Sequence, residues 1–159
     1  ITPRVASLGL TLEEVNDEKF SMFSKEIKQQ IIYLLGGMAA EETIYGDTSS
    51  GVSSDLERAN SYAIRIVSEW GMNKEIGPFI YNLEESITSE HFRRIFEEKI
   101  QALLKELYDV TLKIMKDHKD VLEAIAPVLV KNEVLLGDEI KEIILKVEPD
   151  AEQHRGNYI

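Results

Sequence analysis

The chain has 159 residues, of which 43% are hydrophobic and 30% are charged, and its formal net charge is −11. These values are typical of a folded globular domain and not of a disordered segment. The acidic balance excludes a surface that displaces counterions from a phosphate backbone, so we predict no nucleic-acid partner. The sequence has no cysteine, which excludes disulfides and thiolate metal ligands. No apolar run approaches the roughly 18 residues of a transmembrane helix, so we expect no membrane span in this segment.

The first residues are predicted to form a strand. Apolar residues alternate at Leu8, Leu10 and Leu12, and Pro3 favours an extended backbone just before it. The sequence begins at Ile1 with no polar lead-in, as if in the middle of a strand. We therefore expect that part of the domain lies upstream of Ile1.

Apolar residues at helical spacing predict a long first helix over residues 25–45. Gly36 and Gly37 lie in its interior, where each glycine costs about 1 kcal/mol relative to alanine. Such a cost suggests that another backbone or helix packs closely at this point. Glu41 and Glu42 close the helix, and the glycine- and serine-rich stretch GDTSSGVSS, residues 46–54, predicts a loop.

A second helix is predicted to begin directly after this loop. Ser54 and Glu57 match the S-x-x-E capping box, which predicts Ser54 as the N-cap and Asp55 as the first helical residue. Gly71 is predicted to end the helix. Because Ser54 would already cap the helix, capping does not explain the aspartate at position 55, which suggests a further role for it.

Three more helices are predicted over residues 89–117, over residues 120–131, and from residue 138 onwards. Pro127 is expected to kink or split the second of these. We expect the apolar face of the first to pack on the second as an αα-hairpin, because short loops join antiparallel neighbours. That face consists of Phe92, Phe96, Ile100, Leu103 and Leu107.

The predicted fold is mainly α, with a small β element near the N-terminus and a C-terminal αα-hairpin. Residues 1–147 are predicted to form one domain, and residues 148–159 a flexible tail without periodicity.

The motifs that are absent exclude several activities for these residues alone. Neither G-x-x-x-x-G-K-[ST] nor G-x-G-x-x-G occurs, and there is no H-E-x-x-H pair. Three histidines are present, all in charged surroundings, and we expect them to be solvated surface residues: His91, His118 and His154. A zinc hydrolase site therefore cannot be completed by this chain as given.

Three segments carry a resemblance to a known family. The segment LLGGMAAEETIYGDTSSGVSSDLERANSYAIRIVSEWGMNKEIGP, residues 34–78, resembles the peptidase domain of the FtsH family of membrane-anchored AAA+ zinc metalloproteases. That family shows GG-x-A-E-E, a T-T-G-A loop, N-D-L-x-R-A and Y-G-M-x-x-x-x-G-P in this order. The opening ITPRVASLGLTLEE resembles the strand after the family's H-E-A-G-H helix, and EAIAPVLVKNEVLLGDEIKEII resembles its C-terminal pattern. Here the loop reads S-S-G-V, and Met38 replaces the usual arginine.

The resemblance implies a zinc cofactor and assigns Asp55 as the third zinc ligand, beside two histidines of an upstream H-E-x-x-H motif. That motif's glutamate would activate the water, so no catalytic residue is expected in this chain, which alone should be inactive. The resemblance also places Glu41 near the metal, where it can orient a ligand histidine. The competing interpretation of Asp55 is that it only interacts favourably with the helix dipole, which stabilises the helix by about 0.3–1 kcal/mol. The competing interpretation of Glu41 is that it faces solvent.

The predicted strand has a role if it lies at an edge, because an extended substrate peptide can add to it through main-chain hydrogen bonds. An ordinary structural strand is an equally good interpretation. The residues concerned are Ala6, Ser7, Leu8, Gly9 and Leu10.

For the whole protein, the resemblance implies an ATP-dependent zinc metalloendopeptidase that degrades unfolded or misassembled proteins. It implies a ring-shaped homo-hexamer, with an AAA+ module that uses ATP and magnesium and a membrane anchor, both upstream. The domain would then lie at the cytoplasmic face of the inner membrane, or at the equivalent organelle membrane. The alternative is a non-catalytic helical module for oligomerisation or substrate binding that is derived from the same fold. An H-E-x-x-H motif upstream of Ile1 would distinguish the two.

Overall fold

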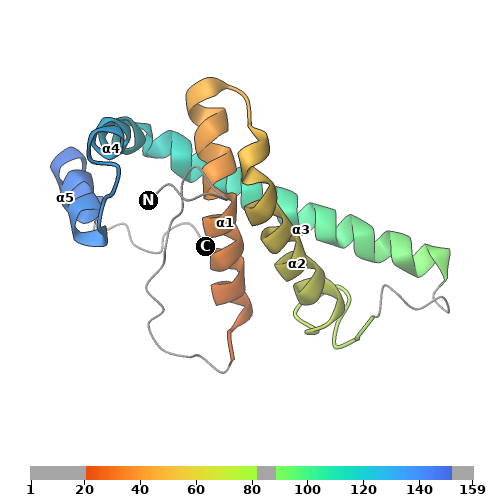
Figure 1. Ribbon diagram of the computed structural model, residues 1–159. Helices are drawn as coiled ribbons and strands as arrows, with labels where there is room; N and C mark the ends of the chain where they lie inside the picture. Colours follow the sequence, from red (N-terminus) through yellow and green to blue (C-terminus); the bar gives the residue numbers. More distant parts are fainter. Residues whose placement is uncertain (1–20, 82–88, 152–159) are drawn as a thin grey trace. The chain divides into compact units, whose positions relative to one another are not determined.

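The computed structural model describes residues 21–81 and 89–151, which are mostly helical (Figure 1). The predicted mainly α fold is confirmed, and the described residues contain no strand. The predicted N-terminal strand, including residues 6–10, lies outside the described residues. The elements are α1 (Ser24–Tyr45), the 3₁₀ turn η1 (Ser50–Val52), α2 (Ser53–Ser68), α3 (Glu90–Asp117), α4 (Lys119–Asn132) and α5 (Gly137–Val147).

The chain divides into two compact units, one formed by residues 22–116 and the other including residues 117–151. The predicted limits of the domain at residue 147 and of the tail at residue 148 stay a prediction. In the part of the chain that the structure describes, no helix is both long enough and apolar enough to traverse a bilayer.

Helix α1 has the bounds that its sequence predicts, and polar contacts set both ends. The backbone N–H of Phe23 donates to the Glu26 carboxylate at 2.8 Å, although a phenylalanine side chain cannot cap the helix in return. At the other end, Gly46 adopts φ 71°, and its N–H donates to the Glu42 carbonyl at 2.9 Å. Glycine accepts this left-handed conformation without steric cost, which ends the helix at Tyr45.

We expected another backbone or helix to pack closely at the glycine pair inside α1, but within the described residues only a side chain lies near it. A Cβ at Gly36 would lie 3.7 Å from the Met115 terminal methyl carbon, which is an ordinary van der Waals distance. Gly37 has nothing within 4 Å of such an atom. The neighbour at Gly36 is therefore the end of a flexible side chain from α3.

The predicted start of α2 is wrong by two residues. The helix begins at Ser53 with Val52 as its N-cap, and Val52 makes no side-chain capping bond. The 3₁₀ turn η1 runs directly into the helix, so Ser54 lies inside the helix, and Asp55 is its third residue. Gly71 is left-handed, with φ 62°, but it follows the end of α2 at Ser68 by several residues.

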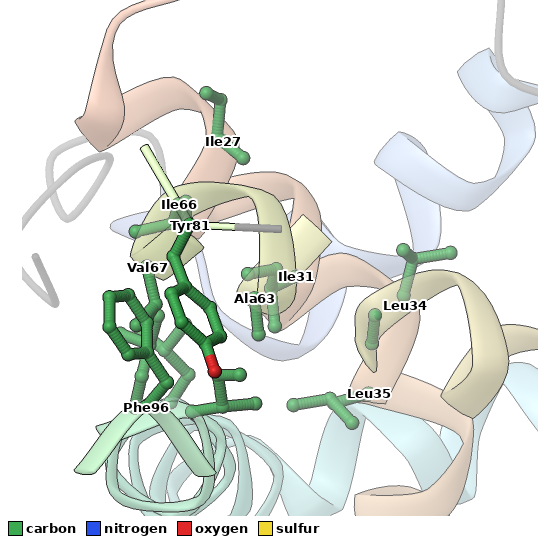
Figure 2. Close-up of a cluster of buried hydrophobic side chains, with 13 residues drawn as sticks. Ile27, Ile31, Leu34, Leu35, Ala63, Ile66, Val67, Tyr81 and Phe96 are labelled. Carbon is green, nitrogen blue, oxygen red and sulfur yellow. The ribbon is translucent and has the colours of Figure 1, made fainter. Parts of the chain in front are cut away.

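The core of the first unit lies where α1, α2 and α3 meet (Figure 2). The apolar face of α3, which we expected to pack on the fourth helix, contributes to this core together with α1 and α2. Phe92 is 52% exposed and takes no part. The C-terminal αα-hairpin is accordingly not confirmed. The buried residues are Ile27, Ile31, Leu34 and Leu35 of α1, Ala59, Ala63, Ile66 and Val67 of α2, Tyr81, and Phe96, Ile100, Leu103 and Leu107 of α3.

In the second unit, α4 packs against α5. Pro127 lies inside α4, and the helix continues to Asn132, so the proline does not split it; the predicted kink stays a prediction.

The three predicted surface histidines have different outcomes. His91 is exposed, as predicted. His118 is not a solvated residue, because its Nδ1 lies 2.7 and 2.8 Å from the two carboxylate oxygens of Glu148. Both side chains are partly buried, with exposed fractions of 30% and 27%. His154 lies outside the described residues. The His118 contact therefore ties the start of α4 to the residue after α5.

Candidate functional site

The candidate site lies at the connection between α1 and α2, where the sequence places Glu41, the serine-rich loop and Asp55. Glu41 is in the last turn of α1 and is half-buried. Its Oε2 accepts a hydrogen bond from the Ser49 backbone N–H at 2.6 Å, and its Oε1 accepts one from the Ser49 hydroxyl at 2.9 Å. Hydrogen bonds to an ionised carboxylate are stronger than neutral ones, so this contact fixes the loop to α1. Glu41 is therefore not simply a solvent-facing acid, while its predicted contact with a ligand histidine stays a prediction.

Asp55 lies in the first turn of α2, and its side chain is 52% exposed. Its Oδ1 is 3.7 Å from Nη1 of Arg58, which is an ion-pair distance but too long for a hydrogen bond. An exposed pair three residues apart on a helix contributes only about 0.2–0.5 kcal/mol. The carboxylate is thus weakly held and accessible to a ligand, which leaves room for the metal-binding interpretation beside the helix-dipole one.

Glu42, next to Glu41, makes a different contact. The Tyr108 hydroxyl of α3 donates a hydrogen bond to a Glu42 carboxylate oxygen, which joins the end of α1 to α3. Burial of Tyr108, together with this hydrogen bond and the nearby negative charges of Glu42 and Asp109, raises the pKa of the Tyr108 phenol from 10.0 to about 12. The two adjacent glutamates therefore hold two different segments to the same end of α1.

The raised pKa of Tyr108 predicts a loss of stability in alkali. Between pH 10 and about 12 the unfolded chain releases the Tyr108 proton while the folded chain keeps it. The free energy of unfolding should therefore fall over this range, whereas below pH 10 the contribution of Tyr108 is fully present. Urea unfolding of the wild type and of Tyr108→Phe from pH 8 upwards measures the difference. We expect the wild type to lose more stability than the variant above pH 10, and parallel curves would contradict the assignment.

The described residues do not form a complete metal site. Among residues 21–81 and 89–151, no group of three histidine, cysteine, aspartate or glutamate side chains lies close enough together to hold an ion. A catalytic zinc needs three protein ligands and an open position for water. Asp55 has the right chemistry for one of these ligands, since carboxylate oxygens bind zinc at about 2.0–2.2 Å. Within the described residues, Asp55 is thus a candidate for a single ligand.

Sequence reasoning missed Ser49, which connects Glu41 to the loop. The hydroxyl of Ser49 also accepts from the Gly51 backbone N–H at 3.2 Å, which makes Ser49 the N-cap of η1. A serine two residues before a glycine is a signal for such a turn. The Ser54–Glu57 capping box offers a local explanation of the helix start that does not involve Ser49.

Comparison with known proteins agrees with the resemblance drawn from the motifs. A family model described as Peptidase family M41 matches residues 1–143. The ATP-dependent zinc metalloprotease FtsH 1 of Rhodopirellula baltica is 35% identical over 156 residues, covering 91% of this chain and 23% of that protein. The ATP-dependent zinc metalloprotease YME1 homolog of Schizosaccharomyces pombe is 35% identical over 146 residues, covering 91% of this chain and 21% of that protein. FtsH of Methylococcus capsulatus is also 35% identical, with 91% and 25% coverage.

These matches cover most of a mainly helical chain, so the sequence defines a peptidase-type domain. The chain belongs to peptidase family M41, within the FtsH group of metalloproteases. It spans about a quarter of the length of the curated relatives that it matches.

Proposed function

We propose that this chain forms part of the peptidase domain of an ATP-dependent zinc metalloendopeptidase that acts on unfolded or misassembled proteins. The observation that carries the proposal is the family match over residues 1–143, which includes the stretch around Asp55. The zinc and the dependence on ATP are proposed from the names of the relatives, which are ATP-dependent zinc metalloproteases.

In this proposal Asp55 supplies one zinc ligand, and the histidines of an H-E-x-x-H motif supply two. The exposed carboxylate of Asp55 supports this role, because its 3.7 Å contact with Arg58 is weak enough for a metal ion to replace it. The bound zinc would supply a Lewis acid and an activated water for peptide hydrolysis. The contribution of this chain is to hold the Asp55 oxygen at the start of α2.

The larger assembly is also a proposal, and it rests on the family resemblance. The whole protein would combine this domain with an AAA+ module that uses ATP and magnesium, and with a membrane anchor in other segments. It would form a homo-hexamer and place the peptidase domain at the cytoplasmic face of the inner membrane, or at the equivalent organelle membrane. Residues 6–10 would offer a strand edge to the extended substrate.

Zinc binding tests the proposed division of the zinc ligands between Asp55 of this chain and an H-E-x-x-H motif. We expect the 159-residue chain to retain little zinc after dialysis and not to cleave casein, because Asp55 alone cannot hold the ion. A longer protein that carries this chain together with an H-E-x-x-H motif should retain one zinc per chain. Elemental analysis of both proteins measures this.

Two outcomes would contradict the proposal. Stoichiometric zinc in the 159-residue chain would show that the chain holds further ligands of its own. A longer protein that retains no zinc and cleaves no casein would instead support the non-catalytic helical module.

A further inference from the structure

The loop between α1 and α2 is held by hydrogen bonds and not by burial. None of the residues of η1 is buried, and Gly46, Asp47 and Ser49 are exposed. A segment without apolar anchors keeps one conformation only through its polar contacts. Besides the Gly46 N–H bond that ends α1, two hydrogen bonds from Ser49 to the Glu41 carboxylate link this loop to α1.

From Ser49 a continuous series of contacts leads to α2. The Ser49 hydroxyl accepts the N–H of Gly51, and the N–H of Ser53 donates to the Ser50 carbonyl, which closes the 3₁₀ turn. The turn is compact, because a Cβ at Gly51 would lie only 3.3 Å from the Ser49 hydroxyl oxygen. Helix α2 then begins at Ser53 without a gap.

The start of α2 depends on this turn because its own cap is missing. Val52 occupies the N-cap position and makes no side-chain hydrogen bond. The first amide groups of a helix need a partner, and a helix without a capping side chain frays at that end. Asp55 lies within this first turn. The backbone at Asp55 therefore directly continues the turn that Ser49 caps.

We propose that Glu41 and Ser49 are positioning residues, which act as a pair to hold the start of α2 and thereby place Asp55 for metal binding. The metal-binding part rests on the proposed function. The pair differs from a Glu41 that orients a ligand histidine, because here Glu41 acts through Ser49. The hydroxyl of Ser49 is then as important as the carboxylate.

The test compares variants in the longer protein that carries an H-E-x-x-H motif, with zinc affinity measured by competition with a chelator. We expect Ser49→Ala and Glu41→Ala each to weaken zinc binding about tenfold, as loss of an outer hydrogen-bonding partner commonly does. The double variant should be no weaker than either single variant, because both remove the same contact. Ser49→Thr keeps the hydroxyl and should restore affinity to within about twofold.

Glu42→Ala is the matched control. It removes the neighbouring carboxylate from the same helix end, but the partner of Glu42 is Tyr108 of α3 and not the loop. We expect Glu42→Ala to lower the melting temperature and to leave zinc affinity unchanged.

A second readout needs no metal. In the 159-residue chain, hydrogen exchange at the Gly51 amide should be several-fold faster in Ser49→Ala than in the wild type, because the amide loses its acceptor. Glu42→Ala should leave this rate unchanged.

The outcomes separate the inference from the proposed function. Wild-type zinc affinity in Ser49→Ala, or an unchanged Gly51 exchange rate, would overturn the inference. A loss of affinity in Glu41→Ala alone would also overturn it, since Glu41 would then act by another route. If Asp55→Asn, measured in parallel, retains full zinc affinity, the proposed function itself fails.

Discussion

Replacing Phe96 with alanine should lower the free energy of unfolding by about 3–5 kcal/mol, the usual cost of truncating a buried aromatic residue. Phe96 is 2% exposed in the core where α3 meets α1 and α2. Its ring also stacks on Tyr81, with centroids 4.3 Å apart and an angle of 13° between the planes. The variant loses both the buried area and the stacking. Since whole domains have only about 5–15 kcal/mol of stability, a large part of the chain's stability should be lost.

Phe92→Ala is the control for this prediction. Phe92 lies one turn earlier on α3, but it is 52% exposed. The same substitution there should change the free energy of unfolding by about 0.5 kcal/mol or less. Urea unfolding of the two variants measures the difference. Equal losses, or a Phe96→Ala variant as stable as the wild type, would contradict the packing of α3 on α1 and α2.

The helices themselves could be predicted from the sequence because their signals are local. The apolar spacing of α1 and the glycine at position 46 set its length, and the observed bounds are Ser24–Tyr45. The third, fourth and fifth helices were also found close to their observed limits. Each of these predictions needs only residues within one or two turns of each other.

The partners of the helices could not be predicted in the same way. Periodicity identifies the face of α3 that is buried, but any apolar face of the right length can cover it. A short connection favoured the fourth helix, whereas the observed core joins Phe96 to residues of α1 and α2. Likewise, nothing near His118 in the sequence indicates its contact with Glu148, 30 residues away.

The candidate site shows the same limit. The S-x-x-E pattern at Ser54 and Glu57 predicted a cap, but the structure begins α2 at Ser53 after a 3₁₀ turn. Ser49 caps this 3₁₀ turn, which runs directly into the helix. The metal role of Asp55 follows from the resemblance to a family and not from spacing, since a lone carboxylate in a first helical turn has no distinctive pattern.

Replacing Asp55 with asparagine should have the largest effect on function. In a longer protein with the H-E-x-x-H motif, the rate of peptide hydrolysis should fall by more than about 100-fold, because losing a ligand costs more than losing an outer partner. The structural cost should be small. Loss of the helix-dipole contribution costs at most about 1 kcal/mol, and the exposed contact with Arg58 adds about 0.5 kcal/mol or less.

The two interpretations of Asp55 therefore predict opposite results. If Asp55 is a ligand, peptide hydrolysis is lost while ATP hydrolysis and the melting temperature of the metal-free protein are kept. If Asp55 serves only the helix start, stability falls modestly and peptide hydrolysis is kept. Arg58→Gln is a useful control, because it removes the ion pair but leaves the carboxylate in place.

Zinc content tests the metal-binding role of Asp55 most directly. The wild-type longer protein and its Asp55→Asn variant would be purified, dialysed against a weak chelator and compared by elemental analysis. We predict one zinc per chain in the wild type and in Arg58→Gln, and a small fraction of that in Asp55→Asn. Full zinc content in Asp55→Asn would contradict the assignment and leave Asp55 as a helix-start residue alone.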